Sequence, residues 1–203
     1  MNEHKNEFIH KRGMEMDKKN ELLAAAREVF AEKGYKAAGI SDIAKRSQMA
    51  VGSFYKYYES KEAIFLEVYV AENSRIREEI MQRVDWQGEP EAIVEQLFAV
   101  TFELISPNKI LAEWNKPGIS QILHDYYNQD SGRASNAFHQ FLIQTFSQRL
   151  QEEGFSKEKI AEIMKVYDLI YYIDMHVTEQ EFSGYFDSLE TLVKYFVKGI
   201  FSK

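Results

Sequence analysis

The stretch VGSFYKYYESKEAIF, residues 51–65, sets several aromatic rings close together with lysines among them. A fully buried helix rarely carries lysine, and a solvated loop rarely carries so many rings. The mixture therefore predicts a short helix with one face in a core and the other on a polar partner. The rings in this stretch are Phe54, Tyr55, Tyr57, Tyr58 and Phe65.

The flanking residues predict a bundle of short helices. Residues 18–33 place apolar side chains at helical spacing on one face, and Gly34 is suited to end that helix. Residues 40–47 predict a second helix, and 48–50 leave room only for a tight turn. The third helix then covers 51–57, so that the order is that of a helix-turn-helix. The apolar face of the first helix comprises Leu22, Ala25, Ala26, Val29 and Phe30.

The rest of the 203-residue chain is predicted to be helical as well. Only three prolines and ten glycines interrupt it, and no segment alternates as a strand does. We expect an all-α fold of about nine helices, with a flexible tail over 1–17, a helix-turn-helix domain over 18–59 and a second helical domain over 60–203. The later helices are expected at 60–84, 91–106, 108–115, 118–127, 132–153, 156–177 and 184–201.

The amino-acid composition excludes several classes of site and of protein. The chain has no cysteine, which excludes disulfides and thiolate metal sites. It shows no signal peptide and no apolar run of membrane-spanning length, which predicts a cytoplasmic protein. The net charge is −7, but residues 1–61 carry 12 Lys or Arg against 9 Asp or Glu, whereas 62–203 carry 13 against 23. An acidic body leaves only the mildly basic end able to approach DNA.

Residues 22–65 resemble the TetR family of bacterial transcriptional repressors. The resemblance rests on the order EKGY, ISDIAKRS, a short turn and VGSFYKYYESKEAIF. It implies that residues 18–59 form a DNA-binding domain and residues 60–203 an effector-binding and dimerisation domain. The dimer would bind a pseudo-palindromic operator in double-stranded DNA and be released by a small effector. We expect no cofactor, no metal and no enzymatic activity. The matching residues are Asp42, Ile43, Ala44, Gly52, Ser53, Phe54, Tyr55, Ser60, Lys61 and Glu62.

The chain departs from the family pattern at three positions. Gly39 stands where a capping threonine is usual, and Gln48 and Ala50 replace a glycine and a serine in the turn. Gln48 must then tolerate a left-handed conformation or use another turn geometry. Ala50 lacks a hydroxyl that could cap the helix and bind phosphate.

The first residues of a recognition helix read base edges in the major groove, while donors at its rim hold phosphates. We therefore expect Val51, Gly52 and Ser53 to read bases. Phe54 and Tyr58 are expected to pack inward. The expected phosphate contacts are Tyr55, Lys56, Tyr57 and Lys61, followed by Lys45 and Arg46, which could equally form a solvated helix face.

The carboxyl-terminal helices suggest a dimer surface. The expected interface residues are Tyr167, Phe186, Leu189, Val193, Phe196, Val197 and Ile200, although both helices could bury these faces within one chain.

The middle of the chain is rich in rings, which could line a pocket for a hydrophobic or aromatic effector or simply form a core. The expected pocket residues are Phe98, Phe102, Trp114, His124, Tyr126, Phe138, Phe141, Tyr167 and Tyr171.

Two other classes were weighed. An enzyme is disfavoured, since the one Glu-x-x-His spacing, Glu7–His10, lies in the expected tail, and no nucleotide-binding or nucleophile motif occurs. A helical protein-interaction scaffold with weakened DNA binding is the alternative, and the departures at Gly39 and Ala50 favour it.

Overall fold

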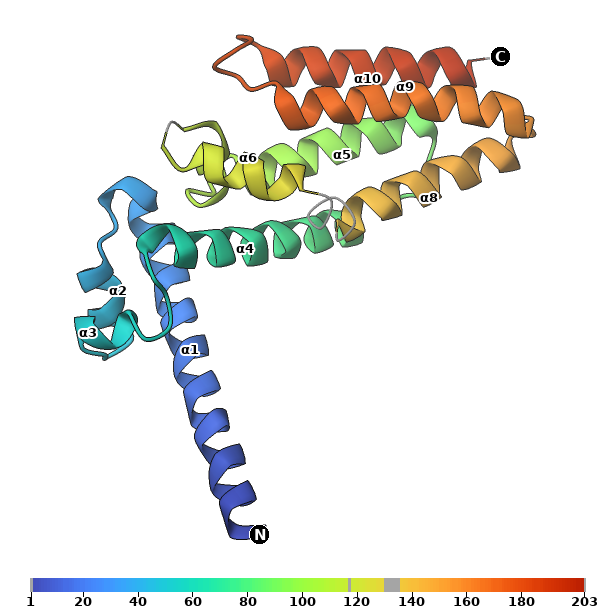
Figure 1. Cartoon of the computed structure of the whole chain (residues 1–203). Helices are drawn as coiled ribbons and strands as arrows, with labels where there is room; N and C mark the ends of the chain where they lie inside the picture. Colours follow the sequence, from blue (N-terminus) through green and yellow to red (C-terminus); the bar gives the residue numbers. More distant parts are fainter. Residues whose placement is uncertain (1, 117, 130–135, 203) are drawn as a thin grey trace. The chain divides into compact units, whose positions relative to one another are not determined.

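The computed structural model describes residues 2–116, 118–129 and 136–202, with side chains from Met14 onward except those of 115 and 128. These residues form nine α-helices and one 3₁₀ helix, and no strand occurs among them (Figure 1). The all-α prediction is confirmed. The elements are α1 (Asn2–Ala37), α2 (Ile40–Arg46), α3 (Val51–Phe54), α4 (Lys61–Arg83), α5 (Pro90–Ile105), η1 (Leu111–Asn115), α6 (Ser120–Asn128), α8 (Ala137–Glu152), α9 (Lys157–His176) and α10 (Tyr185–Phe201).

The helix boundaries differ clearly from the predicted ones in two places. Helix α1 begins at Asn2 and so includes most of the stretch 1–17, for which the sequence predicts a flexible tail; the flexibility itself stays a prediction. No proline interrupts that stretch, and Gly13 alone costs a helix only about 1 kcal/mol. Helix α3 ends at Phe54, and turns replace the helix expected as far as 57. The expected start of a helix at 132 falls within 130–135, outside the described residues.

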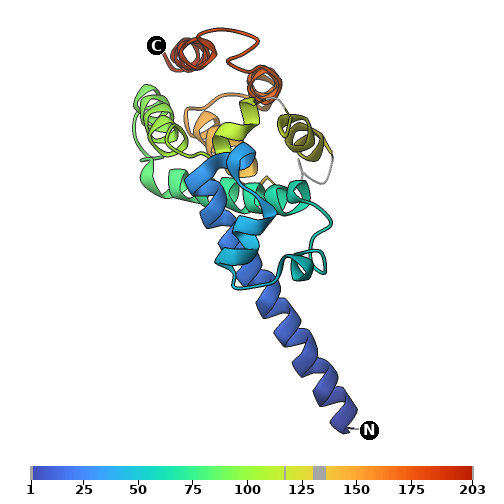
Figure 2. The same ribbon diagram turned by 90° about the vertical axis from the view of Figure 1, so that its left-hand side faces the viewer.

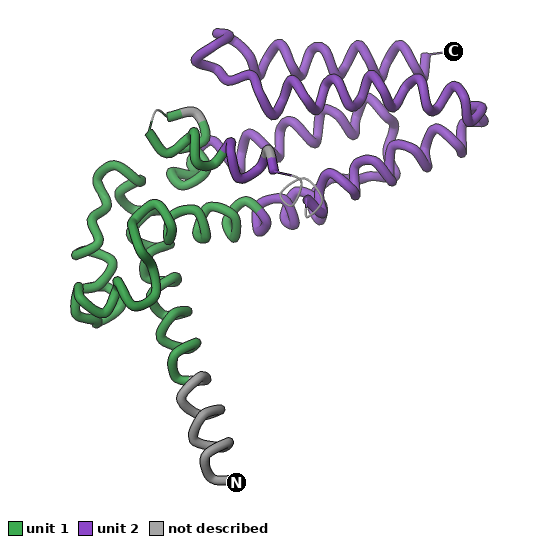
Figure 3. The backbone as a smooth tube through the Cα atoms, in the orientation of Figure 1, with its two compact units in different colours: residues 1–73, 107–123 green, residues 74–106, 124–203 purple. Residues whose placement is uncertain are grey.

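The chain divides into two compact units, which are coloured separately in Figure 3. Unit 1 comprises residues up to Asn73 together with Pro107–Leu123, and unit 2 comprises Ser74–Ser106 and the chain from His124 onward. The expected division at residue 60 remains a prediction. The compact units instead group the segment 107–123 with the helix-turn-helix.

Unit 1 is built on the predicted apolar face of α1. Helix α2 packs against α1 and α3 against α2 (Figures 1 and 2). The ring of Phe30 meets that of Phe65 edge-on at 4.8 Å, and Phe54 and Tyr58 are buried as expected. Leu22, Ala25, Ala26, Val29 and Phe30 are all buried, which confirms the periodicity prediction.

Gly34 interrupts α1 as the sequence predicts. Its φ of 73° and ψ of 172° lie outside the helical region, in a conformation that a side chain would strain. The backbone re-enters the helix for its last turn, up to Ala37. The break exposes several backbone groups near Tyr35, whose partners are described below.

Unit 2 packs α10 on α5 and α8 on α9. Leu189 and Val197 of α10 are buried, and two ion pairs flank that packing, Lys194–Glu95 at 3.5 Å and Lys198–Glu91 at 4.0 Å. Figure 1 shows α9 and α10 running in opposite directions, joined by residues 177–184.

Candidate functional site

The turn between α2 and α3 is closed by backbone hydrogen bonds. The amide of Gln48 donates to the carbonyl of Lys45 at 3.2 Å, and that of Met49 to Ala44 at 2.8 Å. Gln48 adopts a φ of 56°, the left-handed conformation in which the family pattern uses glycine. The helix-turn-helix therefore forms with glutamine there, at the cost of local backbone strain.

The first residues of α3 lie at the surface. Val51 is 46% exposed, and a Cβ added at Gly52 would meet nothing within 4 Å. Nothing within the described chain therefore requires glycine at 52. Ser53 is half-buried and faces α1, in a groove that the two segments share. Two of the three expected base-reading residues are thus openly accessible.

The expected phosphate contacts separate into two groups. Tyr55 is 57% exposed, Lys45 and Lys56 are exposed, and Tyr57 is half-buried at the end of the recognition segment. No hydrogen bond or ion pair holds the ammonium groups of Lys45 and Lys56 within the described residues. These side chains are available to an external anion.

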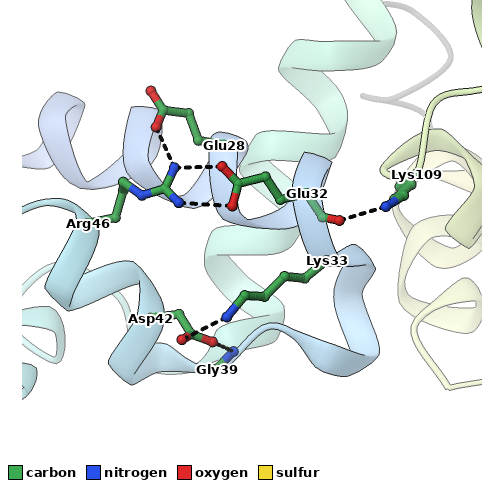
Figure 4. Close-up of polar contacts among 7 residues, drawn as sticks. All are labelled: Glu28, Glu32, Lys33, Gly39, Asp42, Arg46 and Lys109. Carbon is green, nitrogen blue, oxygen red and sulfur yellow. Dashed lines mark hydrogen bonds and ion pairs between the residues drawn. The ribbon is translucent and has the colours of Figure 1, made fainter.

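Arg46 is bound by carboxylates of residues 18–59, the helix-turn-helix domain, which we call the head (Figure 4). Its Nη1 lies 2.8 Å from Glu28, and Nη1 and Nη2 each lie 2.9 Å from an oxygen of Glu32. The hydrogen bond from Arg46 lowers the pKa of Glu32, and the same contact raises the pKa of Arg46. Of the two readings of Arg46, the structure favours a helix-face ion pair over a phosphate contact.

Lys61 also has internal partners. Its Nζ donates to the carbonyls of Tyr35 and Ala38, both at 3.0 Å, and lies 4.2 Å from the centre of the Tyr35 ring. The expected phosphate role therefore conflicts with the observed placement, because the ammonium stabilises the last turn of α1. No sequence pattern indicated these partners of Lys61, because the acceptors are backbone carbonyls distant in the chain.

The residues beside Lys61 lie at the same contact between the start of α4 and the end of α1. Ser60 accepts a hydrogen bond from the amide of Ala63 at 3.2 Å and so caps α4 as expected. The hydroxyl of Tyr35 donates to Glu62, a contact that lowers the pKa of that carboxyl. Lys61 and Glu62 thus connect α4 to the end of α1, whereas Ser60 caps α4 itself.

Helix α2 begins without a side-chain cap at Gly39. The carboxylate of Asp42 instead accepts the Gly39 amide at 3.0 Å and pairs with Lys33 at 2.9 Å (Figure 4). The Lys33 contact, followed by the Gly39 amide, lowers the pKa of Asp42. Half of a capping box is present, and the hydroxyl that the family pattern would offer to a phosphate is missing.

The segment after α5 binds the broken end of α1. Nζ of Lys109 donates to the carbonyl of Glu32 at 2.6 Å (Figure 4), and the buried carboxylate of Glu113 accepts the amide of Tyr35 at 3.3 Å. Asn108 donates to the buried Glu72 of α4 at 2.8 Å. We call residues 108–113 the α1 clamp. No spacing rule in the sequence predicted it.

Unit 2 holds a polar cluster formed by Arg77, Asn136, His139, Tyr167 and Tyr171. Arg77 donates to Asn136 at 2.9 Å, Asn136 donates to the Tyr171 hydroxyl at 3.0 Å, and the Tyr167 hydroxyl lies 3.1 Å from Nδ1 of His139. The His139 ring stacks on Tyr171 at 3.8 Å. Burial lowers the pKa of His139 and raises that of Tyr167.

The expected pocket residues are only partly brought together. Tyr167 and Tyr171 lie in the polar cluster, and the guanidinium carbon of Arg77 lies 5.5 Å from the centre of the Phe138 ring.

Other expected pocket residues lie elsewhere. Trp114 belongs to unit 1, where it stacks on Tyr69, and Phe102 is 70% exposed, so neither fits an interior site in unit 2. Phe141 meets Trp86 edge-on at 4.9 Å, while Phe98, His124 and Tyr126 are half-buried. Sequence reasoning missed Arg77 and Asn136.

The expected dimer stripe faces mostly inward. Leu189 and Val197 are buried, and Phe196 lies 6.1 Å from Phe146. Val193 and Ile200 are half-buried, and Tyr167 belongs to the polar cluster. Among the expected interface residues, Phe186 is the one whose side chain is exposed, at 46%.

Other apolar side chains of this part of unit 2 point outward. We call them the α9–α10 face, and they are Val166, Leu169, Tyr172, Phe182, Phe186, Leu192 and Tyr195.

The described residues contain no cluster of three or more His, Cys, Asp or Glu residues that could hold a metal ion. None of their helices is both long enough and apolar enough to cross a membrane.

A helix-turn-helix with an accessible recognition segment, carried on an all-helical chain, defines a DNA-binding class of protein. Residues 22–68 match the family described as bacterial regulatory proteins, tetR family. The head therefore belongs to the TetR family, and the chain as a whole has an all-helical fold of that type.

Known proteins agree with this assignment. The chain is 40% identical over 62 residues to an uncharacterised HTH-type regulator, YdgC of Bacillus subtilis, covering 30% of this chain and 32% of that protein. It is 34% identical over 64 residues to the regulator QacR of Staphylococcus aureus, covering 32% and 34%. A TetR-family regulator from Mesorhizobium loti superposes with a TM-score of 0.52 at 21% identity, over 91% of this chain and 95% of that one. The chain thus spans about a third of the length of these two curated relatives.

Proposed function

We propose that this protein is a transcriptional regulator that binds a pseudo-palindromic operator as a homodimer. The observation that carries the proposal is the open start of α3, where Val51 is exposed and Gly52 has free space at its Cβ position. A short helix of this kind reads bases in the major groove with its first residues. Tyr55, Lys56 and Lys45 lie exposed beside it as phosphate contacts.

A binding assay on the DNA upstream of the protein's own gene tests this function. The wild-type dimer is expected to retard that fragment at low salt and to prefer it over unrelated DNA of equal length. Tyr55→Phe and Lys56→Ala should weaken both complexes alike, because phosphate contacts carry no sequence information. Val51→Ala should change the preference between fragments. If the wild type retards neither fragment, the regulator proposal is wrong and the interaction-scaffold alternative gains.

That alternative has a structural observation in its favour. Helices α2 and α3 both begin without a side-chain cap, because Gly39 and Ala50 carry no hydroxyl. Two donors that the family pattern offers to phosphates are therefore missing, which predicts weaker DNA binding. The variant Gly39→Thr addresses this directly, since a Cβ at 39 would make only ordinary contacts at 3.4 and 3.5 Å. Tighter DNA binding by this variant would support the regulator reading.

We further propose that a small hydrophobic or aromatic effector binds in unit 2. The polar cluster supports this, because half-buried His139 and Tyr167 lie 3.1 Å apart, hydroxyl to Nδ1, and contact the rings of Tyr171 and Phe146. The effector would shift the population of α4 conformations and change the spacing of the two recognition helices. Screening small aromatic and aliphatic compounds for release of bound DNA tests this step, and no release by any of them would count against it.

A further inference from the structure

A groove of about 750 Å³ separates α1 from the turn and α3. Lys18 lines it from α1, and Ser53, Lys56 and Tyr57 line it from the recognition segment. The proposed DNA-binding residues therefore form one wall of a concave surface, and the opposite wall comes from a helix to which no DNA contact has been assigned. Lys18 also precedes residue 22, where the match to the tetR family begins.

Most cations of unit 1 are occupied by internal partners. Lys19 pairs with Glu67 at 3.0 Å, although it adjoins Lys18 in the sequence. The other occupied cations of the unit, each with a partner given by the structure, are Arg27, Lys33, Arg46, Lys61, Lys109 and Lys116. Among its described side chains, those without an ion pair or hydrogen bond are Lys18, Lys36, Lys45 and Lys56. Two of these four, Lys18 and Lys56, line the groove.

The groove also contains carboxylates, which decide where an anion can lie. Glu28 is neutralised by Arg46 at 2.8 Å, and both line the groove. Glu21 remains and is exposed on the α1 wall. The charged groups lining the groove are therefore three cations, Lys18, Arg46 and Lys56, and two carboxylates, Glu21 and Glu28. Glu28 is already paired with Arg46. A polyanion is favoured near Lys18 and Lys56 and disfavoured near Glu21, which suits a strand that passes across the groove and does not fill it.

We infer that this groove receives the phosphate backbone of one DNA strand, and that Lys18 contacts it from α1. The inference rests on the proposed DNA binding and adds a contact outside the helix-turn-helix. With α3 in the major groove, a flanking backbone must pass beside the recognition segment, where Lys56 and Tyr57 already lie. Lys18 then holds the same backbone from the opposite wall. Its contribution is independent of sequence and depends on salt, as for any phosphate neutralised by lysine.

The absence of cysteine from the chain permits a site-specific test of charge. In Lys18→Cys, the new thiol is the single one present and can be modified by aminoethyl methanethiosulfonate, which restores a cation, or by methyl methanethiosulfonate, which leaves the site neutral. The unmodified variant should bind operator and unrelated DNA up to about tenfold more weakly at 0.1 M salt. The slope of log K against log [salt] should fall in magnitude by about 2, because the proposed homodimer carries two copies of Lys18. The aminoethyl form should recover both quantities, and the methyl form neither.

Lys157→Cys is the matched control, because it removes the same charge from an exposed position of α9 in unit 2. A salt slope for Lys18→Cys equal to that of the control and the wild type overturns the inference while leaving the proposed function intact. A defect that both reagents repair, or that neither repairs, also overturns it, since charge is then not the cause. Failure of the wild type to bind any DNA at low salt removes the proposed function and this inference together.

Discussion

At the scale of single residues, Gln48 carries a backbone conformation that its side chain disfavours. The left-handed region costs a non-glycine residue about 1–2 kcal/mol, whereas glycine enters it freely but loses about 0.5–1 kcal/mol more entropy on folding. Gln48→Gly should therefore raise the free energy of unfolding by about 0.5–1 kcal/mol. Urea denaturation measures this, and Gln48→Ala, which keeps the strain, is the control. A glycine variant less stable than the alanine variant would contradict the account.

Lys61 provides a second prediction at this scale, because its two possible roles have separable effects. Lys61→Met keeps the apolar stem but removes the donor to the carbonyls of Tyr35 and Ala38. We expect a loss of about 1–2 kcal/mol in the free energy of unfolding, as for hydrogen bonds from a charged group. Lys56→Met, which removes an exposed ammonium without internal partners, should change stability by less than about 0.5 kcal/mol.

The opposite pattern would restore the expected phosphate role of Lys61. If Lys61→Met leaves the urea midpoint unchanged but weakens DNA binding as much as Lys56→Met does, the ammonium acts on DNA and the observed contacts are incidental.

Residue-level prediction from sequence succeeded where the cause is local. The burial of Phe54 and the break at Gly34 follow from spacing and backbone conformation alone, and both were confirmed. The partners of Arg46 and Lys61 did not follow, because a long cation chooses among acceptors brought near by tertiary folding. Sequence shows where a charge is, and only the fold shows whether it is already paired.

At the scale of elements, the α1 clamp predicts that residues 108–113 and the end of α1 open together. Glu113→Ala removes the acceptor of the Tyr35 amide, and a lost buried hydrogen bond of about 1–2 kcal/mol lowers protection by roughly 5- to 30-fold. Hydrogen-exchange mass spectrometry should show faster exchange in peptides covering 33–39 and 108–116 alike. Glu91→Ala, an exposed change in unit 2, is the control.

Faster exchange in only one of those two peptides would show that the clamp and α1 are energetically separate. The clamp also marks a limit of pattern reading. Helical periodicity placed a short helix at 108–115, close to the observed η1, but could not say which element it packs against.

The same limit applies to the predicted dimer interface, which stays a prediction. Helix α10 carries a broad apolar face, and the sequence could not divide it between α5 and an outside partner. The structure assigns Leu189 and Val197 to the contact with α5 and leaves Leu192 and Tyr195 outward.

At the scale of the whole molecule, the α9–α10 face predicts how two copies associate. Leu169 is 57% exposed on α9, and an aspartate there would be buried without a partner in a dimer. Leu169→Asp should weaken association by about 3 kcal/mol, or roughly 100-fold. Light scattering coupled to gel filtration should then report the mass of one chain at micromolar concentration, where the wild type reports two.

Phe102→Asp is the matched control for the dimer prediction. Phe102 is 70% exposed but belongs to α5 and lies outside the α9–α10 face, so its variant should keep the wild-type mass. If Phe102→Asp dissociates the protein and Leu169→Asp does not, the interface lies elsewhere on the chain.

The division into compact units bears on protein engineering. The chain passes between the units within α4, after Ser106 and within α6, so unit 1 is not one continuous segment of the chain. A chimera that joins residues up to Asn73 to a foreign sensor would leave Asn108, Lys109 and Glu113 behind. The carbonyl of Glu32 and the amide of Tyr35 would then lose their partners. A DNA-binding module transferred from this protein into a chimera must therefore include Pro107–Leu123 as a second segment.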